Sequence, residues 1–167
     1  MIPILYTETE TVFTTNGFGG LSDAISCVVT EERNGQYELE MTYPVSGVLY
    51  NEISMSRIIR AIPSDGGTIQ AFRIYKITKP INEIITVYAQ HISYQLSFIP
   101  CSPFTAGNVS TALNLLKDHA MESCPFTFWT DKSTSATFKV TKPDIIRGLL
   151  GGQQGSILDV YGGEYEI

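Results

Sequence analysis

The stretch "VVTEERNGQYELEMTYP", residues 28–44, sets an Asn-Gly pair between two segments in which polar and apolar residues alternate. Asparagine and glycine adopt the positive φ angles of a two-residue type I′ turn more readily than other residues. The stretch therefore predicts a β-hairpin that turns at Asn34 and Gly35. Both predicted strands also carry carboxylates, side chains that serve in catalysis as well as on solvated surfaces.

Alternation divides the second strand of this hairpin into two faces. The expected core face consists of Tyr37, Leu39, Met41 and Tyr43, and the opposite face of Glu38, Glu40 and Thr42. If a two-residue turn sets the register, Glu31 lies opposite Glu38. A like-charge pair in that position costs roughly a few tenths of a kcal/mol unless a cation such as Arg33 lies close.

Three further strands are expected after the hairpin, over residues 56–63, 69–77 and 83–90. The connections "SDGG" and "TKPIN" are of hairpin length, so these strands predict an antiparallel meander. Two short pieces, residues 2–6 and 10–13, are expected to be strands before a glycine loop. The strand at 83–90 is apolar on both faces, which indicates a cover over its second face, either from this chain or from a neighbouring subunit.

The pattern changes after about residue 102. Asn108 is the expected N-cap of a helix that runs to Ala120, because apolar residues follow it at helical spacing. Strands at 126–130 and 136–141 are expected to pair with each other. Two short helices follow: one is opened by Pro143 and closed by Gly151, and the other lies between Ser156 and Gly162. The last residues, "GEYEI", predict the start of a strand and hence a longer protein.

These elements predict an α+β fold that is mainly antiparallel β. The expected organisation is a β-rich domain over residues 1–105 and a smaller helix-containing lobe over 106–167 that is incomplete at its C-terminal end. The formal net charge of −6 and the absence of a Lys/Arg cluster argue against nucleic-acid or anionic-membrane binding. No signal peptide and no apolar stretch of roughly 18 residues is present.

Catalytic and metal-binding patterns are weak throughout the sequence. Its only histidines are His91 and His119, and no GxSxG motif accompanies them. His119, Glu122 and Cys124 lie close in sequence but do not make a four-ligand set. The three cysteines form no CxxC pair, which argues against a disulfide framework and fits synthesis in a reducing cytoplasm. We therefore expect no catalytic, cofactor-binding or metal-binding residues.

Several separated segments resemble one family. "LSDAISCVVTEERNGQYELEMTYPVSG", residues 21–47, is similar to the N-terminal region of minor structural proteins from long non-contractile phage tails, often labelled prophage tail endopeptidase or tail-associated lysin. "QAFRIYKITKP", "ITVYAQHISYQLS" and "GLLGGQQGSILDVYGGEYEI" resemble later motifs of that family in the same order. The hairpin signature that carries most of the resemblance comprises Glu31, Glu32, Asn34, Gly35, Tyr37, Leu39, Tyr43 and Pro44.

The resemblance implies a baseplate-hub subunit with a barrel-like domain related to the tail-tube fold. It implies a homotrimer at the virion tail tip, made in the bacterial host cytoplasm, whose partners are the distal tail protein and the tape-measure protein. DNA would pass through the channel without specific binding, and some of Glu31, Glu38 and Glu40 are hypothesised to face that lumen or its rim. The enzymatic or receptor-binding part of such proteins is C-terminal to this region, so no enzyme activity is expected here.

Two alternatives remain open from the sequence. One is a peptidoglycan endopeptidase that uses His91 or His119 with Cys124 or a carboxylate. The other is a cell-wall carbohydrate-binding module, in which exposed aromatic rings form a sugar platform. The aromatic residues considered for that platform are Tyr37, Tyr43, Tyr75, Tyr88 and Trp129.

Overall fold

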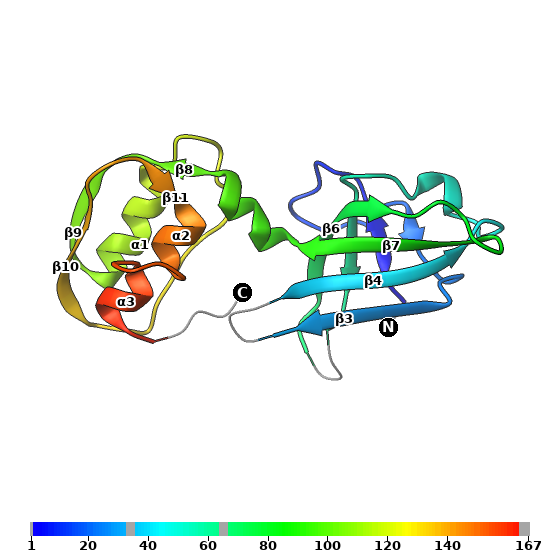
Figure 1. Cartoon of the computed structure of the whole chain (residues 1–167), viewed down its shortest axis with the longest axis horizontal. Coiled ribbons are helices and arrows are strands. Elements are labelled where there is room, and N and C mark those ends of the chain that lie inside the picture. Colours follow the sequence, from blue (N-terminus) through cyan, green and yellow to red (C-terminus); the bar gives the residue numbers. More distant parts are fainter. Residues whose placement is uncertain (1, 33–35, 64–66, 164–167) are drawn as a thin grey trace. The chain divides into compact units, whose positions relative to one another are not determined.

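The computed structural model describes residues 2–32, 36–63 and 67–163, which belong to two compact units, Met1–Ile92 and Ser93–Ile167 (Figure 1). The boundary lies earlier in the chain than the expected 105/106 division. The reason is strand pairing: β8 (Pro100–Cys101) and β9 (Phe104–Asn108) pair with strands of the second unit and not with the first sheet. The fold is mainly antiparallel β with few helices, as the sequence predicts.

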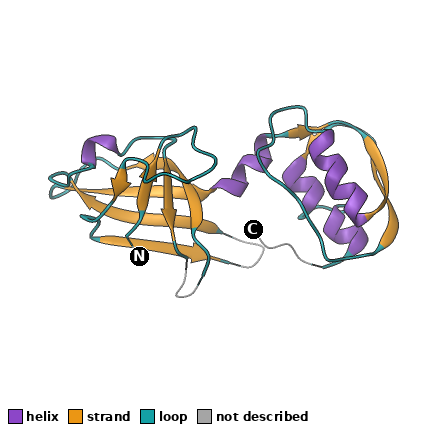
Figure 2. Ribbon diagram, turned by 180° about the vertical axis from the view of Figure 1, so that it is seen from behind, coloured by secondary structure: helices purple, strands orange, loops and turns teal. Residues whose placement is uncertain are grey.

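The first unit is one antiparallel sheet with the strand order β2-β1-β5-β6-β7-β4-β3. Figure 2 shows this sheet curling into a half-barrel. The predicted meander is confirmed, because β5, β6 and β7 are neighbours. The strands are β1 (Ile4–Tyr6), β2 (Gly19–Gly20), β3 (Ser26–Glu31), β4 (Tyr37–Pro44), β5 (Ile58–Ala61), β6 (Gln70–Ile77) and β7 (Ile84–His91), with a short 3-10 helix, η1 (Tyr50–Glu52), between β4 and β5.

The predicted faces of β4 are confirmed by burial. Leu39, Met41 and Tyr43 are at most 1% exposed and pack in the core between the walls of the curled sheet, whereas Glu40 is exposed on the other face. The alternation of β7 follows the same rule, since Ile85 is buried and its neighbours along the strand are half-buried. Removal of apolar area from water at alternate positions is what fixes these strands in one orientation.

The predicted register of the hairpin is wrong by one residue. Thr30 lies opposite Glu38 and Glu31 lies opposite Tyr37, so the expected Glu31–Glu38 pair is not formed. Glu32 donates its backbone N–H to the carbonyl of Gln36 at 2.8 Å, which leaves residues 33–35 between the paired positions instead of two. The Asn34-Gly35 turn itself lies outside the described residues.

Residues 10–13 do not form the expected strand. The Glu10 carboxylate accepts backbone N–H groups from Thr11, Val12 and Phe13 at 3.1, 2.9 and 3.1 Å, which closes a turn in place of a sheet ladder. These bonds lower the pKa of Glu10, with the Val12 N–H as the largest cause. Phe13 then packs edge-on against Tyr6, outside the main core. An internal cover is thus present over β1 and β5.

The second unit packs three helices against short strand pairs. Its elements are η2 (Ile92–Phe98), a 3-10 helix, then β8, β9, α1 (Val109–Asp118), β10 (Ser135–Val140), β11 (Asp144–Ile145), α2 (Ile146–Leu150) and α3 (Ile157–Tyr161). The Asn108 side chain caps α1 by accepting the Thr111 N–H at 2.8 Å, and Ser156 caps α3 in the same way, as predicted. Gly162 follows α3 with a φ of 70°, which glycine tolerates.

Two expectations for the second unit are wrong. β10 pairs with β9 instead of with residues 126–130, and no strand is assigned at 126–130. Phe126 and Phe128 pack against the core from an extended segment, so their apolar alternation reflects burial and not a ladder. The helix expected to open at Pro143 begins at Ile146, because Asp144–Ile145 pairs with β8. The expected strand at "GEYEI" falls almost wholly on residues outside the described part.

Candidate functional site

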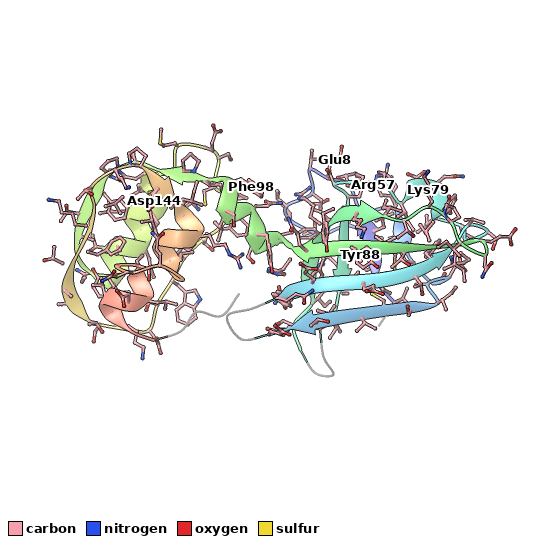
Figure 3. The ribbon with its side chains drawn as sticks, viewed as in Figure 1. Glu8, Arg57, Lys79, Tyr88, Phe98 and Asp144 are labelled. Carbon is pink, nitrogen blue, oxygen red and sulfur yellow. The ribbon has the colours of Figure 1, made fainter. Side chains whose placement is uncertain are left out.

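The outer face of the sheet carries three rows of side chains across β3, β4, β7 and β6. The register places Val28, Glu40, Tyr88 and Lys76 in the central row, Thr30, Glu38, Gln90 and Arg73 in a second, and Ser26, Thr42, Thr86 and Thr78 in a third. Figure 3 labels Tyr88 on β7. The face is polar and aromatic, and at its β6 end Arg73 donates to the backbone carbonyls of Glu8 and Ser56 at 2.9 and 2.7 Å, so neighbouring segments reach the second row.

Hydrogen bonds and ring contacts fix part of this face. The Tyr75 hydroxyl donates to the Glu38 carboxylate at 2.9 Å, and the Gln36 amide donates to the same oxygen at 3.1 Å. The Lys76 ammonium lies 4.8 Å from the centre of the Tyr88 ring, a cation–π contact. Ser26 and Thr42 share a hydrogen bond of 2.6 Å. These contacts hold side chains of the outer face in fixed positions. A face with fixed side chains is better suited to recognise a partner than one whose side chains contact only solvent.

β3, which contributes the first residue of each row, is an edge strand of the sheet. Among the described residues β4 is its sole strand neighbour, and its register with β4 is regular from Ser26 to Glu31. Val28 is 59% exposed, and Glu31 and Glu32 at its end are also exposed. An exposed, regular edge strand is a template for pairing with another chain. Of the hairpin signature, Glu31 lies on this open edge, whereas the residues from Tyr37 to Pro44 lie on β4, an inner strand between β3 and β7.

The acidic residues do not share one face. Glu38 and Glu40 are on the outer face, whereas Glu31 follows Cys27 and Val29 on the side that faces the core and is exposed at the strand end. None of Glu31, Glu32 and Glu40 is ion-paired with a cation in the described ranges; the described ion pair, Arg57–Glu52 at 2.7 Å, lies elsewhere in the sheet unit. The edge of β3 therefore carries carboxylates on both sides that have no ion-pair partner within the described residues.

Tyr37 and Tyr43 of the hairpin signature have structural roles. Tyr43 is fully buried, and its hydroxyl contacts the Asp23 carboxylate at 3.3 Å and accepts the Leu49 N–H at 3.2 Å. Tyr37 stacks on the buried His91 ring with 4.4 Å between ring centres. Burial, with a smaller contribution from the Glu31 charge, raises the pKa of Tyr37 to about 12. Tyr43 is therefore closed to a sugar and one face of the Tyr37 ring is covered, whereas Tyr75 and Tyr88 lie on the outer face with 6.5 Å between their ring centres.

The two histidines belong to different units of the chain. His91 is 2% exposed, and its Nε2 lies 3.1 Å from the Gln70 amide oxygen. His119 follows α1, where its Nδ1 lies 3.0 Å from the Ser102 hydroxyl. The same hydroxyl is 3.3 Å from the His119 carbonyl, which also accepts the Ser102 N–H at 2.9 Å. Ser102 therefore connects the C-terminal end of α1 to the segment between β8 and β9 through hydrogen bonds.

Cysteine and metal chemistry find little support. Burial raises the pKa of the Cys27 and Cys101 thiols to about 11, with a smaller contribution from Cys124 in the case of Cys101, so both are protonated and poorly nucleophilic near neutral pH. Within the described residues, no group of His, Cys, Asp and Glu has the arrangement of a metal site. The three cysteines are free thiols.

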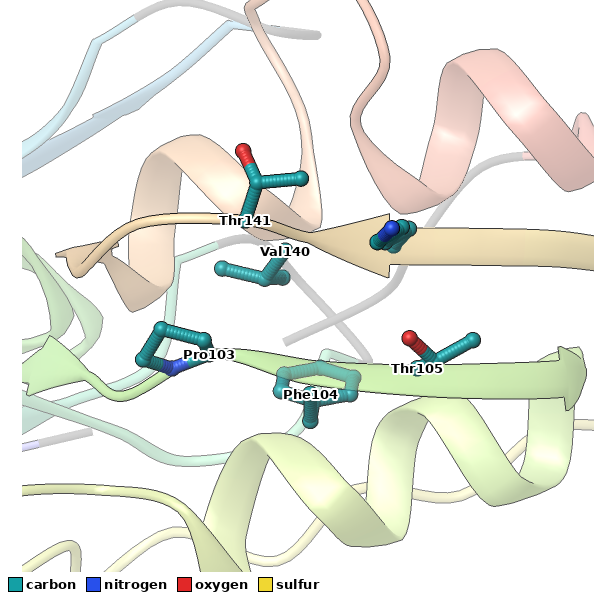
Figure 4. A pocket seen from close by; sticks show the side chains of 6 residues that line it. Pro103, Phe104, Thr105, Val140 and Thr141 are labelled. Carbon is teal, nitrogen blue, oxygen red and sulfur yellow. The ribbon is translucent and has the colours of Figure 1, made fainter.

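The hollows in the surface are shallow. Figure 4 shows one on the β9–β10 pair, lined by Pro103, Thr105 and Thr141 among others. It contains no histidine or carboxylate, and a second hollow beside α1 includes Lys117 and Asp118. Thr127 and Asp118 both line the second hollow, and Lys139 lines the first with its two threonines, but no hydrogen bond between these hydroxyls and a base is formed among the described residues. No helix in the described part of the chain is long and apolar enough to cross a membrane.

Sequence reasoning missed the outer-face network around Tyr75 and Glu38. Tyr75 lies where the β6–β7 register shifts, between Ile74 and Lys76, and this irregularity cannot be read from alternation. The third row, Ser26, Thr42, Thr86 and Thr78, also could not be predicted, because its members are far apart in the sequence and only the strand register aligns them. No protein-family model, curated protein or solved structure matches this chain.

Proposed function

We propose that the chain is a structural subunit of the tail tip or baseplate hub of a long-tailed phage or prophage. It works by protein–protein assembly at the end of the tail tube and carries a host-interaction or lytic part C-terminal to this region. The observation that carries the proposal is that three of the segments resembling tail proteins fold as adjacent strands, β4, β6 and β7, of a single sheet with the open edge β3. These three segments therefore belong to one folded sheet, and the open edge of that sheet supports a role in assembly.

The proposed partners follow from the same resemblance. The assembled form is a homotrimer that contacts the distal tail protein and the tape-measure protein at the virion tail tip. DNA passes without specific binding, in keeping with the net charge of −6. Glu38 and Glu40 share the outer sheet face, so if that face lines the lumen, both carboxylates repel the phosphate backbone.

The test is a measurement of assembly. Purified chain, alone and mixed with a candidate distal tail protein, is analysed by size-exclusion chromatography with light scattering. We expect a trimer, or a complex of defined stoichiometry with that partner. A chain that stays monomeric at high concentration and does not co-elute with distal tail proteins would overturn the proposal.

A second candidate function, peptidoglycan hydrolysis, has one observation in its favour, the 3.0 Å contact between Ser102 and His119. A serine hydrolase requires a base on its nucleophile and a third group that orients the base. In the described chain no carboxylate is hydrogen-bonded to His119, and the Ser102 hydroxyl has a backbone acceptor nearby. We therefore expect no clearing in cell-wall zymography. Clearing that a His119→Ala variant loses, while a Lys117→Ala control keeps it, would favour the enzyme.

A further inference from the structure

The backbone of β3 presents hydrogen-bonding groups to the open edge of the sheet. Glu32 donates its N–H to the carbonyl of Gln36 across the hairpin, so this pair belongs to the ladder. Bonded and unbonded positions alternate along an antiparallel pair. Thr30 and Val28 therefore bond to β4, whereas Cys27, Val29 and Glu31 direct their N–H and C=O groups outward.

The edge lacks most of the features that protect edge strands from pairing. Proteins block such edges with proline, lysine, bulges or very short strands. β3 runs over six residues, contains neither proline nor lysine between Ser26 and Glu31, and keeps a regular register there. Val28 in its middle is 59% exposed, so an apolar contact is available beside the outward backbone groups. The edge is suited to accept an additional strand.

The carboxylates near β3 determine which charge an added strand should carry. Glu31 and Glu32 lie at one end of β3 on opposite faces, and Glu40 lies beside Val28 on β4. Cross-strand pairs of opposite charge stabilise a sheet by roughly 0.2–1 kcal/mol, and like charges destabilise it. A second copy of this chain would bring its own acidic edge and a further net charge of −6, whereas a strand with Lys or Arg near Glu31 and Glu32 would neutralise them.

We propose that the open edge of β3 binds an extended segment of a partner protein by strand addition. The segment carries a small apolar residue opposite Val28 and basic residues beside Glu31 and Glu32. Main-chain hydrogen bonds to Cys27, Val29 and Glu31 supply affinity, and the carboxylates supply selection. This inference rests on the proposed assembly function, because it names the surface through which the subunit contacts a partner.

The test uses the full chain and two synthetic peptides, acetyl-KKTTVTTKK-amide and acetyl-EETTVTTEE-amide, in which two adjacent charged residues at each end reach both faces of the strand pair in either strand direction. NMR follows hydrogen exchange of the Cys27, Val29 and Glu31 amides at saturating peptide. We expect the basic peptide to slow exchange at these three amides by about tenfold or more, and the acidic peptide to leave it unchanged. High salt should weaken the effect, because the carboxylates are exposed.

Two variants separate the contributions. Val29→Pro removes an outward N–H but no bond to β4, so it should keep the fold and lose peptide binding. The double variant Glu31→Lys with Glu32→Lys should reverse the preference and bind the acidic peptide. Equal binding of both peptides by the unmodified chain, or unchanged exchange with either, would overturn the proposal, and so would slow exchange in the free chain caused by pairing of two copies.

If neither peptide binds while the trimer or distal-tail complex forms, this inference alone fails. If the basic peptide binds and no assembly forms, the proposed function fails.

Discussion

Replacing Gly47 by alanine is expected to lower the free energy of unfolding of the first unit by about 3 kcal/mol. An added Cβ would lie 2.3 Å from Cε1 of Tyr43 and 2.8 Å from its hydroxyl oxygen. Overpacking a filled site typically costs about 1–3 kcal/mol, and more where the neighbour cannot move. Tyr43 cannot swing away, since it is fully buried and its hydroxyl contacts Asp23 and the Leu49 N–H.

The loop around Gly47 would be disturbed along with the ring. The Asp23 carboxylate that contacts the Tyr43 hydroxyl also accepts the Val48 N–H at 2.8 Å, so a displaced ring removes two restraints on the segment after β4. Urea denaturation provides the measurement. Gly20→Ala is the control in the same unit, because its added Cβ lies 3.1 Å from Cγ2 of Ile2, an exposed side chain that can move, and its expected effect is below about 1 kcal/mol. Equal losses for the two variants would contradict the steric explanation.

Alternation predicted the sheet more successfully than it predicted the connections between strands. Leu39 and Met41 were correctly assigned to the core because a period of two leaves no other way to bury both. The register at Glu31 was wrong, since turn length depends on backbone geometry that an Asn-Gly pair favours but does not impose. Alternation also predicted a strand over residues 10–13, where the Glu10 carboxylate instead accepts three backbone N–H groups and closes a turn.

Non-local pairing limited what the sequence predicted for the second unit. The apolar alternation of Phe126 and Phe128 is compatible with a strand, but β9, earlier in the chain, occupies the edge of β10. Helix caps at Asn108 and Ser156 were predictable because they depend on residues three positions away. The candidate surface was predictable in part: the hairpin signature led to β3, whereas the Tyr75–Glu38 contact required the register of three strands.

Replacing Phe138 by alanine is expected to destabilise the second unit by about 3–5 kcal/mol, the usual cost of deleting a buried phenyl ring. Phe138 is 1% exposed in β10, and its ring lies 5.7 Å from that of Phe104 and 6.4 Å from that of Tyr161. The cavity would thus open between β9, β10 and α3. Lys139→Ala, at the exposed neighbouring position in β10, is the matched control and should change stability by less than about 0.5 kcal/mol.

The effect of Phe138→Ala should be confined to one unit, because the buried residues around Phe138 all belong to residues 96–161 and the sheet has a separate core. Hydrogen exchange followed by mass spectrometry on the intact chain distinguishes the units. Peptides from residues 93–163 should exchange faster in the variant, while those from β4, β6 and β7 keep their protection. Loss of protection throughout both units would show that they unfold as one cooperative body, and the open edge of β3 would then depend on the integrity of both cores.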